Sequence, residues 1–268
     1  MLYERGIQNL FRILPPEDID IRTLKTLSNI PTATRDNSPR KNFDGVVVRK
    51  PWGFEYLACE SEHVALWALK LKFNQQTSMH CHPEKLTVML ALSDGIVLST
   101  LSSIYKLNVG DVIYIEPGTF HRSSSTNLQG DWLLEFETPV DKFDLVRLDD
   151  AYGRSVSAYE GSEHHLKENE EIELVQWLSR YNYVTPKESA IVGDATISFF
   201  RIIGPDVDLL AIQKWASAMN LIVLVSDSNE QSATSSGFGP LEFISPRDIA
   251  RRFHSDLHGQ EFILGIRW

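Results

Sequence analysis

Two histidines separated by one residue constrain the fold of this chain more than any other feature. His80 and His82 lie in a short segment that reads as a β-strand, so their side chains point to one face and Cys81 points to the other. Further along, a glycine turn, an apolar strand and a second turn end at His121. If the two strands face each other in a small β-barrel, three imidazoles converge, which is a common catalytic metal site. The sequence therefore predicts one divalent metal on these histidines, with zinc as the first choice and nickel, iron or manganese as alternatives.

These residues resemble the two motifs of the cupin family. His80 and His82 match the His-x-His of the first motif, but the glutamate of that motif falls near Leu86 or Thr87, where the chain has no glutamate. The second motif, a glycine followed by Pro-x-Gly-x-x-His, is matched by Gly110, Gly118 and His121, with Pro117 one position late. The resemblance implies a cupin double-stranded β-helix, or jelly-roll barrel, in which one metal ligand position is lost.

The strand pattern independently favours a mainly all-β fold. Short apolar segments alternate with Gly, Asp, Asn and Ser, which is typical of an antiparallel sandwich or barrel. The expected strands cover residues 54–57, 64–73, 80–82, 86–92, 96–101, 104–107, 112–115 and 132–137.

Residues 1–44 are expected to form a short helical N-terminal arm. Ile7, Leu10, Phe11 and Leu14 have helical spacing before two prolines, and residues 18–27 suggest a second short helix. Such an arm packs either on the barrel or on a partner subunit, so a homodimer is one expectation.

The barrel is expected over residues 45–155, and residues 156–268 are expected to hold a helix and a degenerate second cupin-like β domain. The helix is predicted over 168–180, and strands are predicted over 196–203, 209–212, 221–225, 241–244 and 262–266.

Composition excludes several classes of partner. The formal net charge is −10 and no Lys/Arg cluster is present, so no nucleic-acid partner is expected. No apolar run reaches the ~18 residues of a membrane helix. Charged residues interrupt the N-terminal segment, which does not read as a signal peptide, so a cytoplasmic location is expected. An anionic small molecule remains a candidate ligand, because cations lie within or next to the barrel segment, namely Lys50, Lys85, Arg122, Arg147 and Arg154.

Within the cupins, residues 46–154 resemble the isomerase domain of type II mannose-6-phosphate isomerases. That domain opens with Arg-Pro-Trp-Gly, matched by Lys50 to Gly53, and closes with a segment matched by Asp144 to Arg154. Its first metal motif is Gln-x-His followed by a glutamate. His80 takes the glutamine position and Thr87 the glutamate position, so the fourth ligand is absent.

The resemblance implies aldose–ketose isomerisation of a sugar or sugar phosphate. Glu135 is the candidate base, because strand parity points it inward with Glu137 and it matches a glutamate of the family. Arg147 and Arg154 are predicted either to hold a phosphate or enediolate, or to form structural salt bridges. Lys50, Lys85 and Arg122 are predicted to contact the substrate.

Two other functions remain open from the sequence. A three-histidine site would also suit a cupin oxygenase that uses iron. A cupin that has lost a metal ligand could instead be a non-catalytic carbohydrate-binding protein.

Overall fold

A computed structural model of the chain describes residues 11–28, 43, 45–60, 63–142, 144–152, 190–202, 209–226, 241–247 and 261–268. The chain divides into two compact units, one formed by Met1–Cys59 and Ala65–Ser179, the other by Glu60–Val64 and Arg180–Trp268. The three-part division expected from the sequence is finer than these two units and stays a prediction.

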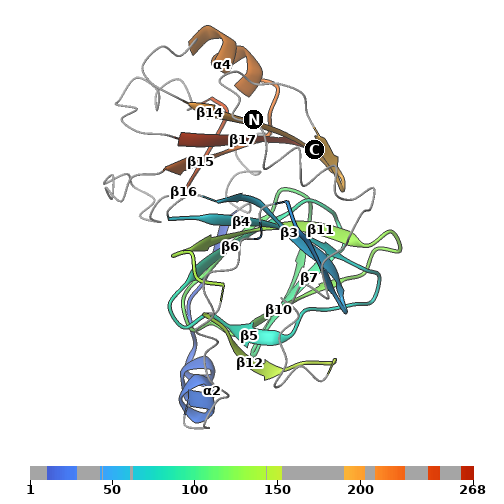
Figure 1. Ribbon diagram of the computed structural model, residues 1–268, viewed down its shortest axis with the longest axis vertical. Helices are drawn as coiled ribbons and strands as arrows, with labels where there is room; N and C mark the ends of the chain where they lie inside the picture. The colour runs from blue at the N-terminus through green and yellow to red at the C-terminus, as the bar shows by residue number, and fades with distance from the viewer. Residues whose placement is uncertain are drawn as a thin grey trace, which may run out of the picture. The chain divides into compact units, whose positions relative to one another are not determined.

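The first unit is built from two β-sheets (Figure 1). The seven-stranded sheet has the order β1-β9-β6-β11-β4-β3-β2 and the five-stranded sheet has the order β12-β5-β10-β7-β8. The seven strands of the larger sheet are β1 (Phe11–Leu14), β2 (Val47–Lys50), β3 (Gly53–Glu60), β4 (Ala65–Leu71), β6 (Leu86–Ala91), β9 (Val112–Ile115) and β11 (Asp131–Thr138). Those of the smaller sheet are β5 (Met79–Cys81), β7 (Ile96–Thr100), β8 (Ile104–Leu107), β10 (His121–Ser125) and β12 (Val146–Asp149).

The strand order is that of a jelly roll. The run β4-β11-β6-β9 lies in one sheet and the run β5-β10-β7-β8 in the other, and neighbours within each run are antiparallel. Along the chain, successive strands from β4 to β11 therefore alternate between the sheets, except for the β7–β8 hairpin. This is the double-sheet arrangement of jelly rolls, and it confirms the predicted fold class.

The core of the first unit lies between the two sheets. On β4, the alternate residues Trp67, Leu69 and Leu71 are buried in this core, as the two-residue period predicts. The strand expected to reach Phe73 ends at Leu71, and Phe73 is 40% exposed. Residues from the other sheet, such as Leu98, pack against them.

The described part of the N-terminal arm starts with a strand, where the spacing of apolar residues predicts a helix. Phe11–Leu14 (β1) pairs in parallel with β9, so the helix prediction is wrong for these residues; Ile7 and Leu10 lie outside the described residues. The reason is tertiary, because the edge of β9 offers unpaired backbone groups that a short helix ending at Pro15 could not use. Helix α2 (Asp18–Ser28) confirms the helix predicted over 18–27.

Hydrogen bonds and apolar contacts join helix α2 to the five-stranded sheet. Its buried Asp20 accepts hydrogen bonds from the backbone N–H of Glu17 at 2.8 Å, which caps the helix, and of Phe120 at 3.0 Å. The helix therefore reaches the residue that precedes His121. A small apolar cluster completes the contact and contains Leu24, Leu27, Met79, Cys81 and Phe120. Cys81 thus faces away from His80, as predicted, and is buried.

The second unit is β-rich, as expected. Its described strands form one antiparallel sheet in the order β13-β14-β17-β15-β16. They are β13 (Ala190–Val192), β14 (Ala195–Ile202), β15 (Leu221–Ser226), β16 (Leu241–Ile244) and β17 (Glu261–Arg267). The resemblance of this half to a second cupin barrel stays a prediction.

One element of the second unit corrects the sequence-based prediction. Residues 209–212 were expected to be a strand, but they begin helix α4 (Leu209–Ala216). Ile212 and Ala216, four residues apart, both face the sheet, whereas Leu210 is 78% exposed, and this is the period of a helix. The helix predicted over 168–180 lies outside the described residues. Neither of the described helices is long and apolar enough to cross a membrane.

Candidate functional site

Strands β5 and β10 bring three histidines together in the first unit. His121 lies directly opposite His80 in the antiparallel pair, and their ring centroids are 4.5 Å apart. His82, which follows β5, lies 5.1 Å from the ring of His80 and 5.5 Å from that of His121. Their ligating nitrogens all lie within 4.8 Å of one another. The three histidines singled out in the sequence therefore form one group, called here the histidine cluster.

Backbone carbonyls fix which nitrogen of each imidazole carries the proton. A carbonyl oxygen can only accept a hydrogen bond, so each Nδ1 donates and each Nε2 keeps its lone pair. Histidines that bind metals are commonly oriented in this way. The three bonds run from His80 to Ser78 (2.8 Å), from His82 to Asp144 (2.5 Å) and from His121 to Thr119 (3.0 Å).

The protonation state of the histidine cluster favours binding of a cation. Burial lowers the pKa of all three imidazoles, and that of His121 falls to about 4, so the rings are neutral at neutral pH. The Nε2 atom of His121 is buried and has no hydrogen-bond partner in the part of the chain that the structure describes. Neutral rings with an unsatisfied acceptor fit a divalent metal, so the cluster could hold one.

The fourth ligand position carries no carboxylate. Thr87 in β6 is fully buried, and its Oγ1 has no hydrogen-bond partner among the described residues. It lies directly opposite Glu137 of β11. Glu84, three positions before Thr87, is exposed in the turn after β5. Within the described ranges, the metal-ligand group therefore consists of three imidazoles.

A cavity inside the first unit joins the histidines to charged side chains of the facing sheet. His80 and His82 line it, together with apolar residues that include Trp52 and Leu69. The charged residues that line it are Lys50, Glu55, Lys85, Glu135, Glu137, Lys142 and Arg147. The structure thus gathers most of the predicted catalytic and substrate-binding residues around one cavity.

Arg147 reaches the cavity from β12. Strand β12 pairs with β5 and extends the five-stranded sheet. Arg147 lies opposite His80 in this pair, and residues directly opposite in an antiparallel ladder share a face. Arg147 is therefore beside the histidine cluster. Arg154 lies outside the described residues, so its predicted role stays a prediction.

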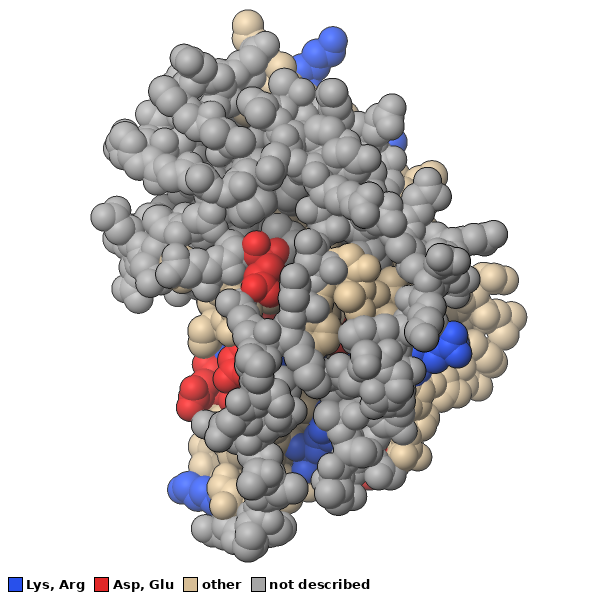
Figure 2. All heavy atoms as spheres, viewed as in Figure 1, with Lys and Arg blue, Asp and Glu red and all other residues tan. Residues whose placement is uncertain are grey.

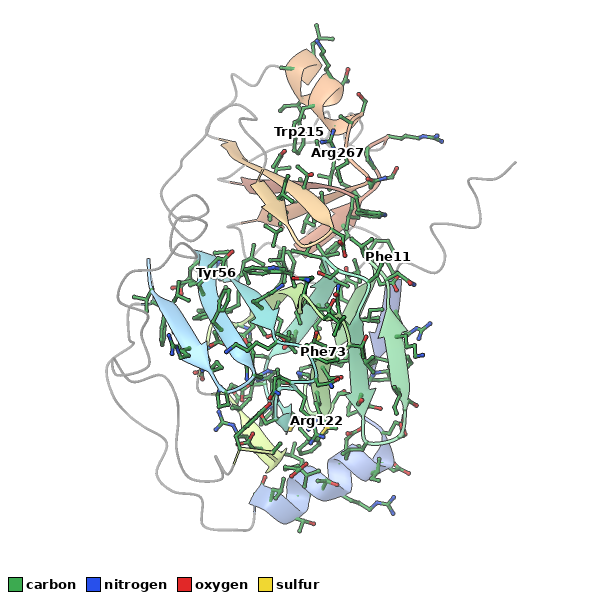
Figure 3. All side chains as sticks on the ribbon, turned by 90° about the vertical axis from the view of Figure 1, so that its right-hand side faces the viewer. Phe11, Tyr56, Phe73, Arg122, Trp215 and Arg267 are labelled. Carbon is green, nitrogen blue, oxygen red and sulfur yellow. The ribbon has the colours of Figure 1, made fainter. Side chains whose placement is uncertain are left out.

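Arg122 is not brought together with the other predicted substrate contacts. It follows His121 in β10, so strand parity points it to the opposite face. Its guanidinium donates to Asp149 of β12 at 2.6 Å. Arg122 is labelled in Figure 3. The residues that line the cavity do not include it. An ion pair with Asp149 is the role that its position supports.

Glu135 and Glu137 both face the cavity from β11, but their environments differ. Glu137 pairs with Lys85 at 2.9 Å, and both side chains are buried. For Glu135, burial raises the pKa, and the neighbouring charges of Glu137 and Glu55 raise it further, to about 8. The Glu135 carboxyl is therefore mostly protonated at neutral pH, and it ionises at pH values just above neutral. A strongly shifted carboxyl in a cavity is a typical feature of a catalytic acid or base.

Sequence reasoning missed a second ionic group in the cavity. Oε1 of Glu55 lies 2.8 Å from Nζ of Lys142 and 3.4 Å from Nζ of Lys50. Burial alone would raise the pKa of Glu55, but the two lysines lower it to about 2. Lys142 also lies over the ring of Trp67, 3.5 Å from its centroid. The available signal was a charged residue within the apolar strand segment 54–57.

Asp144 was also missed as a residue that positions the site. Its Oδ2 accepts the backbone N–H groups of Glu84 and Lys85, at 2.9 and 2.8 Å, while its carbonyl accepts from His82. No sequence pattern identifies such a contact, because it spans about sixty residues of chain.

Among the described residues, the basic side chains visible in Figure 2 do not form a stripe. The described lysine and arginine residues visible there appear as separate groups, with acidic residues elsewhere on the same face. The absence of a nucleic-acid partner remains an expectation from composition.

No protein-family model matches this chain, and no curated protein matches it. Solved structures that are similar include KdgF from Halomonas sp., with 11% identity, a TM-score of 0.33, and 34% of this chain and 84% of that chain covered. An uncharacterised protein with a double-stranded beta-helix domain from Klebsiella pneumoniae shows 14% identity over 45% of this chain and 98% of that chain, with a TM-score of 0.33. An RmlC-like cupin from Shewanella frigidimarina shows 12% identity over 42% and 93%, with a TM-score of 0.31.

The fold assignment rests on the strand order itself. The chain has a jelly-roll fold. The closer resemblance to mannose-6-phosphate isomerases remains an expectation from the sequence motifs.

Proposed function

We propose that this protein is a metal-dependent isomerase that interconverts the aldose and ketose forms of a sugar or sugar phosphate. The observation that carries the proposal is the arrangement of the cavity. Imidazoles able to hold a metal come from one sheet, and Glu135, whose pKa is raised to about 8, comes from the facing sheet. Aldose–ketose isomerisation needs both a proton carrier and a positive centre.

Glu135 is the proposed proton carrier. In the aldose-to-ketose direction, its ionised carboxylate takes the proton from C2 and returns it to C1, while the proton of the O2 hydroxyl ends on O1. A base is most effective when its pKa lies near the operating pH, because it is then both substantially ionised and sufficiently basic. A pKa of about 8 meets that condition.

The positive centre has two proposed components. A divalent ion on the histidine cluster would supply a Lewis acid for the substrate oxygens, and zinc is the first choice because nitrogen donors suit it, with nickel, iron or manganese as alternatives. Arg147, beside His80, can bind an enediolate or a phosphate with two parallel hydrogen bonds. Arg154 is proposed as the second arginine. Lys50 and Lys85 line the same cavity and favour a negatively charged substrate.

An oxygenase is the second candidate, because the metal-ligand group contains no carboxylate. Three neutral imidazoles with Thr87 at the fourth position would also hold ferrous iron. The two functions differ in a simple way, since an oxygenase consumes oxygen and an isomerase does not.

The test uses protein purified without a histidine tag, stripped of metal and reloaded with zinc, nickel, manganese or ferrous iron. Mannose 6-phosphate in deuterated water should gain deuterium at C2, as followed by proton NMR, with at least one of these metals. Glu135→Gln should lose the exchange, whereas Glu84→Gln, an exposed carboxylate in the turn after His82, should keep it. Oxygen uptake with ferrous iron and no deuterium exchange with any metal would replace the isomerase by the oxygenase.

A further inference from the structure

Lys85 is a buried ammonium in the cavity that His80 and His82 also line. Lys85 is 1% exposed, and its Nζ lies 2.9 Å from Oε1 of Glu137. Its backbone N–H is held by Oδ2 of Asp144, whose carbonyl accepts a hydrogen bond from His82. The same aspartate therefore fixes the start of the lysine side chain and the orientation of one imidazole. Lys85 is built into the site and is not a surface residue that happens to point inward.

The charge of Lys85 interacts electrostatically with all three imidazoles of the histidine cluster. Beside the larger effect of burial, it lowers the pKa of His80, His82 and His121. Glu137 acts in the opposite direction at His121. Lys85 follows His82 by three residues and lines the same cavity as His80 and His82, whereas Glu137 lies on β11 of the facing sheet. The ammonium is therefore expected to outweigh the carboxylate at the imidazoles.

We propose that Lys85 sets the metal affinity of the histidine cluster, by repelling a divalent cation that binds the three imidazoles. This inference rests on the proposed function only in that both place a metal on this cluster. A buried charge is weakly screened, so its repulsion of a doubly charged ion is substantial. The cavity holds the ammonium of Lys85, and Thr87, which lies opposite Glu137 in the sheet, is neutral.

Glu137 has the opposite effect in this arrangement. Its carboxylate attracts the metal and offsets part of the charge of Lys85. Removing the two charges singly and together therefore gives a predicted order of affinities. Lys85→Met should bind metal most tightly, the double variant Lys85→Met/Glu137→Gln next, then the wild type, and Glu137→Gln should bind most weakly.

The experiment measures metal binding alone. Untagged, metal-free protein is titrated with Co²⁺ and with Zn²⁺ in competition with a chromophoric chelator. Lys85→Met should bind both ions about tenfold or more tightly than the wild type, and Glu137→Gln about tenfold or more weakly. Lys106→Met is the matched control, because Lys106 is an exposed lysine on β8, and it should leave the affinity unchanged.

Folding is monitored by the melting temperature, since Lys85→Met leaves Glu137 buried without its partner. If that variant fails to fold, the double variant decides the question, because it removes both charges and should still bind more tightly than the wild type. A folded Lys85→Met or double variant with wild-type or weaker affinity would overturn the inference.

Isomerisation assayed in parallel separates this inference from the proposed function. Metal-dependent isomerisation with unchanged affinity in the Lys85 variants would refute the role of Lys85 alone. Tighter binding in those variants, with no isomerisation by any form of the protein, would refute the proposed function alone.

Discussion

The backbone carbonyl of Asp144 accepts a hydrogen bond from Nδ1 of His82, which lies 62 residues earlier in the chain, at 2.5 Å. The side chain of Asp144 holds the following turn through the N–H groups of Glu84 and Lys85. One residue therefore fixes both the tautomer of a candidate metal ligand and the path of the chain that leaves it. Loss of such a contact to a metal-binding histidine typically lowers metal affinity by about 10- to 100-fold.

Asp144→Ala should weaken metal binding by about tenfold or more, because the turn after His82 loses its anchor. Two backbone N–H groups also lose their acceptor, so the free energy of unfolding should fall by about 1–3 kcal/mol. Competition titration with Zn²⁺ and chemical denaturation measure the two effects. Asp149→Ala is the control, because its exposed carboxylate on β12 pairs with Arg122, and it should change neither quantity appreciably. Equal metal affinity in the two variants would contradict the role given to Asp144.

His82→Ala should abolish tight metal binding while the protein stays folded. Two remaining imidazoles seldom retain a metal, and the lost side chain is only one of three that converge in the cluster. Elemental analysis of the purified, dialysed variant measures the effect. His63→Ala changes a histidine outside the cluster and should retain wild-type metal content. Stoichiometric metal in His82→Ala would exclude the histidine cluster as the metal site.

The histidine cluster could be predicted because its information is local. Two histidines in one strand share a face by the period of the strand, and the Gly-x-x-His turn before β10 has a recognisable pattern. The antiparallel strands of the jelly roll were predictable for the same reason, since apolar runs between turn residues mark them. Glu135 was also placed inward by parity alone.

What could not be predicted depends on contacts between distant segments. Strand β1 forms because β9 leaves an edge open, and β12 forms because β5 needs a partner on its other side. Lys85 gave no sign in the sequence that it would be buried against Glu137, about fifty residues away. Charges at such positions are energetically tolerable only when paired, and the pairing appears only in the fold.

Asp20→Ala should destabilise the protein and also loosen the histidine cluster. The buried carboxylate joins α2 to the N–H of Phe120, which immediately precedes His121. Loss of two hydrogen bonds from a buried charge should cost about 2–4 kcal/mol. The metal affinity should fall with it, as measured by the same competition titration. Asp18→Ala, at an exposed position in the first turn of α2, should cost only a few tenths of a kcal/mol. A destabilised Asp20→Ala with unchanged metal affinity would show that α2 supports the fold but not the cluster.

The pH dependence of isomerisation should follow the ionisation of the Glu135 carboxyl group. As a base it must be ionised, and its pKa is raised to about 8, so kcat/KM should fall tenfold for each pH unit below about 8 and level off above it. Glu135→Gln should lose most of the activity, and its kcat/KM should no longer fall in this way below about pH 8. Glu84→Gln should keep both the activity and this pH dependence. If kcat/KM instead falls only below about pH 4.5, Glu135 is not the base.

The pH dependence of protein stability tests the raised pKa of Glu135 independently of activity. Glu135 has a higher pKa when folded than when unfolded, so the folded state holds more protons between about pH 4.5 and 8. Its contribution to stability is therefore fully present below pH 4.5 and is lost as the pH rises through about 8. Relative to Glu135→Gln, the wild type should lose free energy of unfolding across that window, as measured by urea denaturation at a series of pH values. If the two curves stay parallel from pH 4.5 to 9, the carboxyl does not have a raised pKa, and the argument that makes it the base loses its electrostatic support.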